Sequence, residues 1–141
     1  MKTPWIGTSW KMNKTLPEAL AFAEGLAGAD PSRDSRVQRF VIPPFTAVRQ
    51  VKAALADTSV KVGAQNMHDK ANGAFTGEVS AAMLRDLHVS YVILGHSERR
   101  SLFGEDDAFI NRKVNAALAA SLKPILCVGE LLAEREAGTT N

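Results

Sequence analysis

The residues with the clearest chemical potential lie in one short segment, Gly-His-Ser-Glu-Arg-Arg at 95–100, which directly follows the uncharged run 91–94. That run predicts a strand buried on both faces. Ser97 and Glu98 favour the start of a short helix immediately after the turn. His96 would face the positive end of this helix, which opposes protonation of its imidazole. A neutral imidazole can polarise a carbonyl group by donating a hydrogen bond, although a lone loop histidine is more often an ordinary solvated side chain.

Strand-like and helix-like segments alternate along the chain, and this alternation decides where the chemical groups fall. The expected strands are residues 5–10, 39–42, 60–65, 91–94 and 124–128. The expected helices are one beginning at Thr15 and ending before a polar connection at 28–36, one around 48–55, one opened by Ser80, one after Ser97, one over 106–120 and one over 131–136. The apolar stripe expected for the helix over 106–120 is Phe109, Val114, Ala117 and Leu118. A repeated strand–helix order predicts an α/β fold with a parallel sheet and helices packed outside it.

Four polar residues occur at or just past the C-terminal end of an expected strand: Lys11, Asn66, His96 and Glu130. Because parallel strands place these ends on one face, where α/β enzymes carry out their chemistry, a shared site is geometrically feasible. The position of these four residues after strands is weak evidence on its own, since ordinary polar loop residues also follow strands.

Composition restricts the class of protein. The chain has 141 residues, the size of a single domain over 1–141, with 45% hydrophobic and 23% charged residues, which is typical of a globular protein. The chain has seventeen basic and fifteen acidic residues, and the basic residues form no stripe along the sequence. Nucleic acid is therefore not an expected partner. No apolar run is long enough to cross a membrane and no leader is evident. One cysteine, Cys127, excludes an internal disulfide and fits a cytoplasmic location.

The sequence lacks the common motifs for binding nucleotides and metal ions. There is no G-x-G-x-x-G and no P-loop signature. His68, His88 and His96 lack the spacing of metal ligands and no cysteine cluster accompanies them, so we expect no metal and no cofactor. Cys127, within an apolar strand, is expected to be a small buried hydrophobe and not a nucleophile.

Five motifs together carry a family resemblance: Ser-Trp-Lys-Met-Asn at 9–13, Gly-Ala-Gln-Asn at 63–66, Asn-Gly-Ala-Phe-Thr-Gly-Glu at 72–78, the segment 91–100, and Cys-Val-Gly-Glu at 127–130. With them the chain resembles the triosephosphate isomerase family from about Trp5 onward. The resemblance implies a (β/α)₈ barrel, of which about five strands are present here. It also implies cofactor-free isomerisation of triose phosphates through an enediol, with a place in glycolysis and gluconeogenesis.

The resemblance assigns roles to individual residues. Lys11 would attract the phosphorylated substrate and stabilise the negative charge of an enediolate-like transition state. His96 would donate a hydrogen bond to the substrate oxygens and shuttle a proton between them. The corresponding histidine of the family is a known example of a neutral histidine at a helix N-terminus. Glu98 would support Lys11 electrostatically, although a carboxylate at a helix start also has a purely structural explanation. Arg99 and Glu105 resemble a structural ion pair.

The loop 66–79 matches the segment that, in this family, inserts into a second subunit. The resemblance implies a homodimer, with Thr76 at the loop tip touching the catalytic residues of the neighbour. Phe75 and Gly77 beside it would also contact the partner.

The resemblance implies that Ser9 stands at a substrate-binding position, where the family normally has asparagine. A serine hydroxyl is shorter and offers one donor where an amide offers two. Together with the segment 39–49, Ser9 is similar to a branch of the family that isomerises tetrulose phosphates such as L-erythrulose 1-phosphate. The four-carbon substrate is therefore an alternative to the triose substrate.

The strand–helix pattern stops in its fifth unit, whereas a complete barrel of this kind takes about 250 residues. The family's catalytic base, its lid loop and its phosphate-gripping loops match nothing here, so residues 1–141 alone are expected to be inactive, as a fragment of an isomerase would be. The outer strands would have exposed edges. A hypothesis from another class is a non-catalytic half-barrel that serves as an assembly or binding piece.

Overall fold

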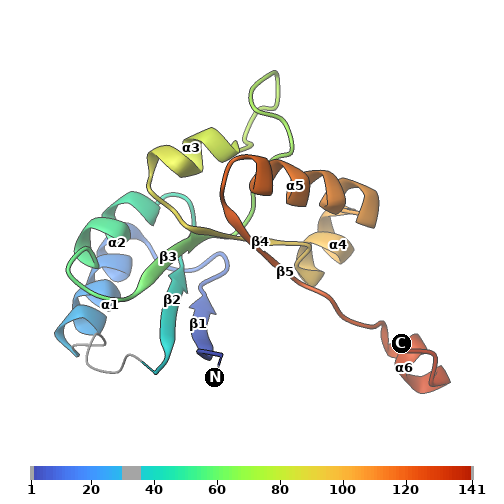
Figure 1. The fold of residues 1–141 in the computed structure, drawn as a ribbon, viewed down its shortest axis with the longest axis horizontal. Helices are drawn as coiled ribbons and strands as arrows, with labels where there is room; N and C mark the ends of the chain where they lie inside the picture. The colour runs from blue at the N-terminus through green and yellow to red at the C-terminus, as the bar shows by residue number, and fades with distance from the viewer. Residues whose placement is uncertain (1, 30–35, 141) are drawn as a thin grey trace.

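Five parallel strands, with helices on their outer side, make up the computed structural model, which describes residues 2–29 and 36–140 (Figure 1). The strands are β1 (Trp5–Ser9), β2 (Gln38–Ile42), β3 (Lys61–Ala64), β4 (Tyr91–Leu94) and β5 (Lys123–Leu126). The helices are α1 (Leu16–Gly28), α2 (Val48–Ala54), α3 (Ala81–Asp86), α4 (Ser97–Phe103), α5 (Asp107–Ala119) and α6 (Leu132–Ala137). The expected α/β alternation is confirmed.

Side-chain caps fix where the longer connections turn into helices. The Glu18 carboxylate accepts hydrogen bonds from the Thr15 backbone N–H at 2.7 Å and from its hydroxyl at 2.9 Å, which begins α1. Ser80 Oγ accepts from an N–H in the first turn of α3 at 3.3 Å. Asp106 caps α5 by accepting from the Phe109 N–H at 2.8 Å. These caps set the helix starts that the sequence predicts.

The sheet has the order β1-β2-β3-β4-β5, so each strand pairs with the next in the chain. β1 and β2 pair along five residues, from Trp5 opposite Gln38 to Ser9 opposite Ile42. The Trp5 and Tyr91 rings meet at a centroid distance of 4.7 Å although their strands are not neighbours. The sheet is therefore curled, and its concave side is the interior of an open, incomplete barrel.

The hydrophobic core lies between the outer face of the sheet and the helices. Its strand contribution is Val41, Val62, Ala64, Val92 and Leu94, and its helix contribution includes Ala19, Ala23, Val48, Val51, Leu84 and Ala117. The two outermost strands are less well covered: Ile6 on β1 is 61% exposed and Leu126 on β5 is 48% exposed. The exposure expected at the edges of the sheet is confirmed.

Some expectations need correction. β5 ends at Leu126, two residues earlier than expected, so Cys127 lies just outside the strand and is half-buried. Leu118 is exposed, while Lys113 is buried on the face of α5 that packs inward. Most of the polar connection expected at 28–36 lies outside the described residues.

No helix within residues 2–29 and 36–140 combines the length and the apolar character that a membrane span requires.

Candidate active site

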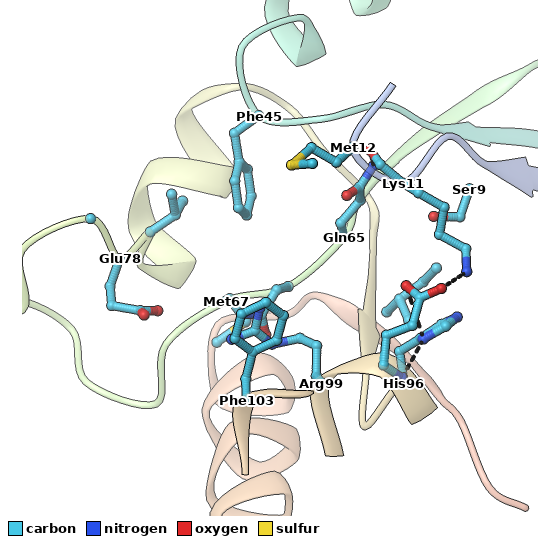
Figure 2. A pocket seen from close by; sticks show the side chains of 15 residues that line it. Ser9, Lys11, Met12, Phe45, Gln65, Met67, Glu78, His96, Arg99 and Phe103 are labelled. Atoms are coloured by element: carbon cyan, nitrogen blue, oxygen red, sulfur yellow. Dashed lines mark hydrogen bonds and ion pairs between the residues drawn. The ribbon is translucent and has the colours of Figure 1, made fainter. Parts of the chain in front are cut away.

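A cavity of about 300 Å³ lies at the C-terminal ends of the first four strands (Figure 2). Its polar lining includes Ser9, Lys11, Gln65, His96, Glu98 and Arg99. Asn66 also reaches it, so three of the four residues expected to share one edge of the sheet are brought together. This edge is where a parallel sheet places the loops that carry function.

His96 is the N-cap of α4, one residue earlier than the cap that the sequence suggested. Its Nδ1 accepts a hydrogen bond from the Glu98 backbone N–H at 3.1 Å. A nitrogen that accepts a hydrogen bond carries no proton, so this contact fits the imidazole tautomer that has its proton on Nε2. In this tautomer the Nε2–H of His96 is a hydrogen-bond donor at the cavity.

Lys11 follows β1 with a φ of 57°, in the left-handed region that costs a residue with a side chain about 1–2 kcal/mol. Its ammonium group forms an ion pair with Glu98 Oε1, as Figure 2 shows. This hydrogen bond from Lys11 lowers the pKa of the Glu98 carboxyl group, which keeps it ionised. Both side chains are about half exposed, at 44% and 48%, so the cation remains accessible to an anionic ligand.

A buried ion network supports the floor of this site. Glu105 Oε1 accepts from Arg99 Nε at 2.7 Å, which confirms the expected pair, and it also binds the Lys113 ammonium group. Lys113 Nζ further donates to Asn66 Oδ1 at 3.0 Å. Burial raises the pKa of Glu105, but the hydrogen bonds from Lys113 and Arg99 outweigh it, so its pKa is lowered and the carboxylate is charged.

Lys113 and Gln65 are two site residues that the sequence did not predict. Lys113 is 1% exposed, and it stands three residues after Ile110 and four before Ala117. That spacing places it on the buried face of α5. A lysine in register with buried apolar residues was therefore the available signal. Gln65 had a weaker one, because it directly follows β3 at the edge where the other polar groups gather.

Ser9 is the last residue of β1 and lies opposite Ile42 of β2. It lines the cavity beside Lys11, and Figure 2 places its hydroxyl on the same side as the Lys11 ammonium group. The structure thus puts the residue that departs from the family pattern within the site itself.

The loop 66–79 projects from the body of the chain between β3 and α3 (Figure 1). The His68 N–H donates to the Val79 carbonyl at 2.8 Å and closes the base of the loop. Phe75 stacks on His68 with a ring distance of 4.2 Å and is 41% exposed, and Thr76 next to it is exposed. Gly77 is also exposed but lines the cavity of its own chain.

Glu130 does not join the site. It lies beyond β5, where its carboxylate pairs with Arg135 and accepts from the Thr140 hydroxyl. Glu130 therefore does not share a site with Lys11, Asn66 and His96, and that expectation is wrong. The reason is that the chain leaves the sheet after Leu126 and runs out to α6 (Figure 1). Among the described residues, no cluster of three histidine, cysteine or acidic side chains could hold a metal ion.

Comparison with known proteins agrees with this geometry. The family model described as triosephosphate isomerase matches residues 4–141. Three curated relatives, each named L-erythrulose-1-phosphate isomerase, match 134 residues or 95% of the chain. The proteins from Rhizobium meliloti (strain 1021), Rhizobium rhizogenes (strain K84 / ATCC BAA-868) and Brucella abortus (strain 2308) are 63%, 61% and 60% identical. The chain spans about half the length of these relatives, at 52%, 51% and 52%. Because the family model covers nearly the whole chain, the chain belongs to the triosephosphate isomerase family.

Proposed function

We propose that these residues form the first half of a cytoplasmic sugar-phosphate isomerase whose preferred substrate is a tetrulose phosphate of the L-erythrulose 1-phosphate type. The identity of 60–63% to relatives of that name supports the four-carbon substrate over the triose substrate. Ser9 supports it independently, because a serine takes less space than the asparagine usual in the family and leaves room beside Lys11.

The observation that carries the proposal is the arrangement of Lys11 and His96 along one side of the cavity (Figure 2), where Glu98 pairs with Lys11. The ammonium group of Lys11 would bind the substrate and stabilise the negative oxygen of an enediolate. The Nε2–H of His96 would donate to that oxygen and pass a proton between the two substrate oxygens. Glu98 would hold Lys11 in place through their ion pair.

The reaction also needs a base that removes a proton from the carbon next to the carbonyl group. None of the carboxylates that line the cavity has a position that singles it out for this role: Glu98 is paired with Lys11, and Glu78 lies on the opposite side of the cavity (Figure 2). We propose that the base comes from the second half of a family-length protein. The exposed apolar side chains of Ile6 and Leu126 mark the strands against which that half would close the barrel.

The substrate proposal predicts that the full-length protein converts L-erythrulose 1-phosphate with a higher kcat/KM than triose phosphates. We further expect Ser9→Asn to move the preference toward the triose substrate by about tenfold or more, since one small group in a pocket changes discrimination by 10–200-fold. Steady-state kinetics with both substrates provides the measurement. Ser121→Asn is the matched control, because Ser121 is exposed and has a φ of 58°, which asparagine tolerates.

A wild-type preference for triose phosphate would reject the four-carbon substrate and leave the isomerase proposal standing. A full-length protein that converts neither substrate would reject the isomerase proposal and favour the half-barrel hypothesis of an assembly or binding piece.

We also propose a homodimer in which the loop 66–79 of one copy covers the cavity of the other. Phe75 and Thr76 are exposed at the loop tip. The rim of the cavity is apolar and accessible, with Met12 97% and Phe103 65% exposed, and Phe45 completes it (Figure 2). An apolar rim around a polar floor suits a loop that carries an aromatic side chain and a hydroxyl group.

Thr76→Arg in the full-length protein should convert the dimer to a monomer, because the added cation would approach Lys11 of the other copy and could not be accommodated in a closed interface. Sedimentation velocity reports the mass directly. Thr3→Arg serves as the control, because Thr3 is likewise an exposed threonine and lies before β1, and this variant should remain dimeric. A wild-type protein that sediments as a monomer, or a Thr76→Arg variant that stays dimeric, would contradict the proposed interface.

A further inference from the structure

Gln65 connects the loop that carries Lys11 to the sheet. It directly follows β3, and its side-chain Nε2 donates hydrogen bonds to two backbone carbonyl groups, that of Lys11 at 2.9 Å and that of Ile42 at 3.2 Å. One amide group therefore joins the C-terminal ends of β2 and β3 to Lys11, the second residue after β1. Figure 2 places the Gln65 side chain next to the Lys11 backbone, away from the ammonium group.

The backbone at Lys11 requires such support because its φ of 57° is unfavourable for a residue with a side chain. The preceding residue is already fixed, since the Trp10 N–H donates to the Ile42 carbonyl at 3.0 Å and its carbonyl accepts from Asn13 Nδ2 at 2.8 Å. The following residue, Met12, is 97% exposed, so its side chain contributes little packing that would hold the loop. The carbonyl of Lys11 is thus held to the sheet by Gln65.

We propose that Gln65 is a positioning residue that keeps Lys11 in its left-handed conformation and so aims the ammonium group at Glu98 and at the bound substrate. Without this hydrogen bond, φ at Lys11 can relax to the negative values that other residues prefer, which redirects its Cα–Cβ bond. Gln65 then affects the reaction through Lys11 and need not touch the substrate. The inference rests on the proposed isomerase function for its kinetic test.

The test replaces Gln65 by methionine, which has a similar length and no donor. Gln38 provides a matched control because its Nε2 also donates to two backbone carbonyl groups, those of Arg39 at 2.9 Å and Ser59 at 3.0 Å. Gln38 begins β2, at the opposite end of the sheet from the cavity. In the full-length protein, Gln65→Met should lower kcat/KM for L-erythrulose 1-phosphate by about tenfold or more, which corresponds to 1.4 kcal/mol. Gln38→Met should be about as active as wild type.

Two further measurements separate positioning from a general structural role. In a Lys11→Ala background, adding Gln65→Met should cost no further activity, because the residue through which Gln65 acts has gone. An equal loss in both backgrounds would overturn the inference. Gln65→Asn, which retains the amide but draws it back by one methylene group, should lose activity as Gln65→Met does and is available if the methionine variant does not fold. Full activity in the asparagine variant would also overturn the inference.

A measurement without substrate distinguishes this inference from the proposed function. Trypsin cleaves after lysine only where the backbone can adopt an extended conformation, so a released loop should be cut faster after Lys11 in Gln65→Met than in Gln38→Met or wild type. Equal cleavage rates would overturn the positioning role. If the wild-type protein converts no sugar phosphate, the proposed function fails, and the cleavage rates still decide whether Gln65 holds Lys11.

Discussion

His96→Asn in the full-length protein should lower kcat by about 10²–10⁴-fold, the usual contribution of a positioned proton donor. The asparagine carbonyl can take the place of Nδ1, which accepts from the Glu98 N–H at 3.1 Å, so the cap of α4 is retained. The substitution therefore removes Nε2 and its proton while leaving the local fold intact. Initial-rate kinetics at saturating substrate measures the effect.

His88→Asn is the control for this change. His88 is exposed at the end of α3 and has a φ of 56°, a conformation that asparagine adopts readily. We expect this variant to keep the activity of the wild-type protein. If His96→Asn were as active as His88→Asn, the Nε2–H of His96 would have no part in the reaction.

The sequence predicts the order of strands and helices well because their signals are local. Buried strands appear as short apolar runs, and the helices begin at capping residues such as Thr15, Ser80 and Asp106 that act on their own first turn. The cluster of Lys11, Asn66 and His96 also follows from local information, since any parallel sheet brings the ends of its strands together. The edge exposure at Ile6 and Leu126 could be expected for the same reason.

Other features depend on contacts between distant parts of the chain, and local patterns do not reveal them. The spacing within α5 places Lys113 on the buried face of the helix, but its partners Glu105 and Asn66 come from two other segments, which no spacing within α5 encodes. The hydrogen bond from Gln65 to Lys11 depends on a backbone conformation at residue 11 that only the folded loop defines. Glu130 follows a strand as the other candidates do, yet it lies outside the site because the chain turns away after β5.

Lys113→Met should destabilise the full-length protein by about 3–5 kcal/mol, the typical cost of removing one partner from a buried ion pair. Lys113 is 1% exposed, and its loss leaves the Glu105 carboxylate in the interior with Arg99 as its remaining cationic partner. The Asn66 carbonyl also loses its donor at the base of the loop 66–79. Denaturant unfolding followed by circular dichroism measures the change in free energy.

Lys70→Met is the matched control, because Lys70 is 59% exposed and lies 3.9 Å from Asp69, an arrangement worth about 0–1 kcal/mol. A double variant, Lys113→Met with Glu105→Leu, should recover part of the lost stability, because it removes the Glu105 carboxylate that the loss of Lys113 leaves without one of its cationic partners. If Lys113→Met cost no more than Lys70→Met, the buried network would not contribute to stability.

Acid titration gives this prediction a second readout. The folded pKa of Glu105 lies below its unfolded value, so its pair with Lys113 and Arg99 stabilises the protein above the unfolded pKa, and this contribution is lost as the pH falls through the folded pKa. In Lys113→Met the carboxyl group loses a hydrogen-bond donor, its folded pKa rises, and less stability remains to be lost on acidification. The free energy of unfolding should therefore fall less steeply with acid in the variant than in the wild-type protein. If the free energy of unfolding fell equally steeply with acid in the two proteins, Lys113 would not be the group that keeps Glu105 ionised.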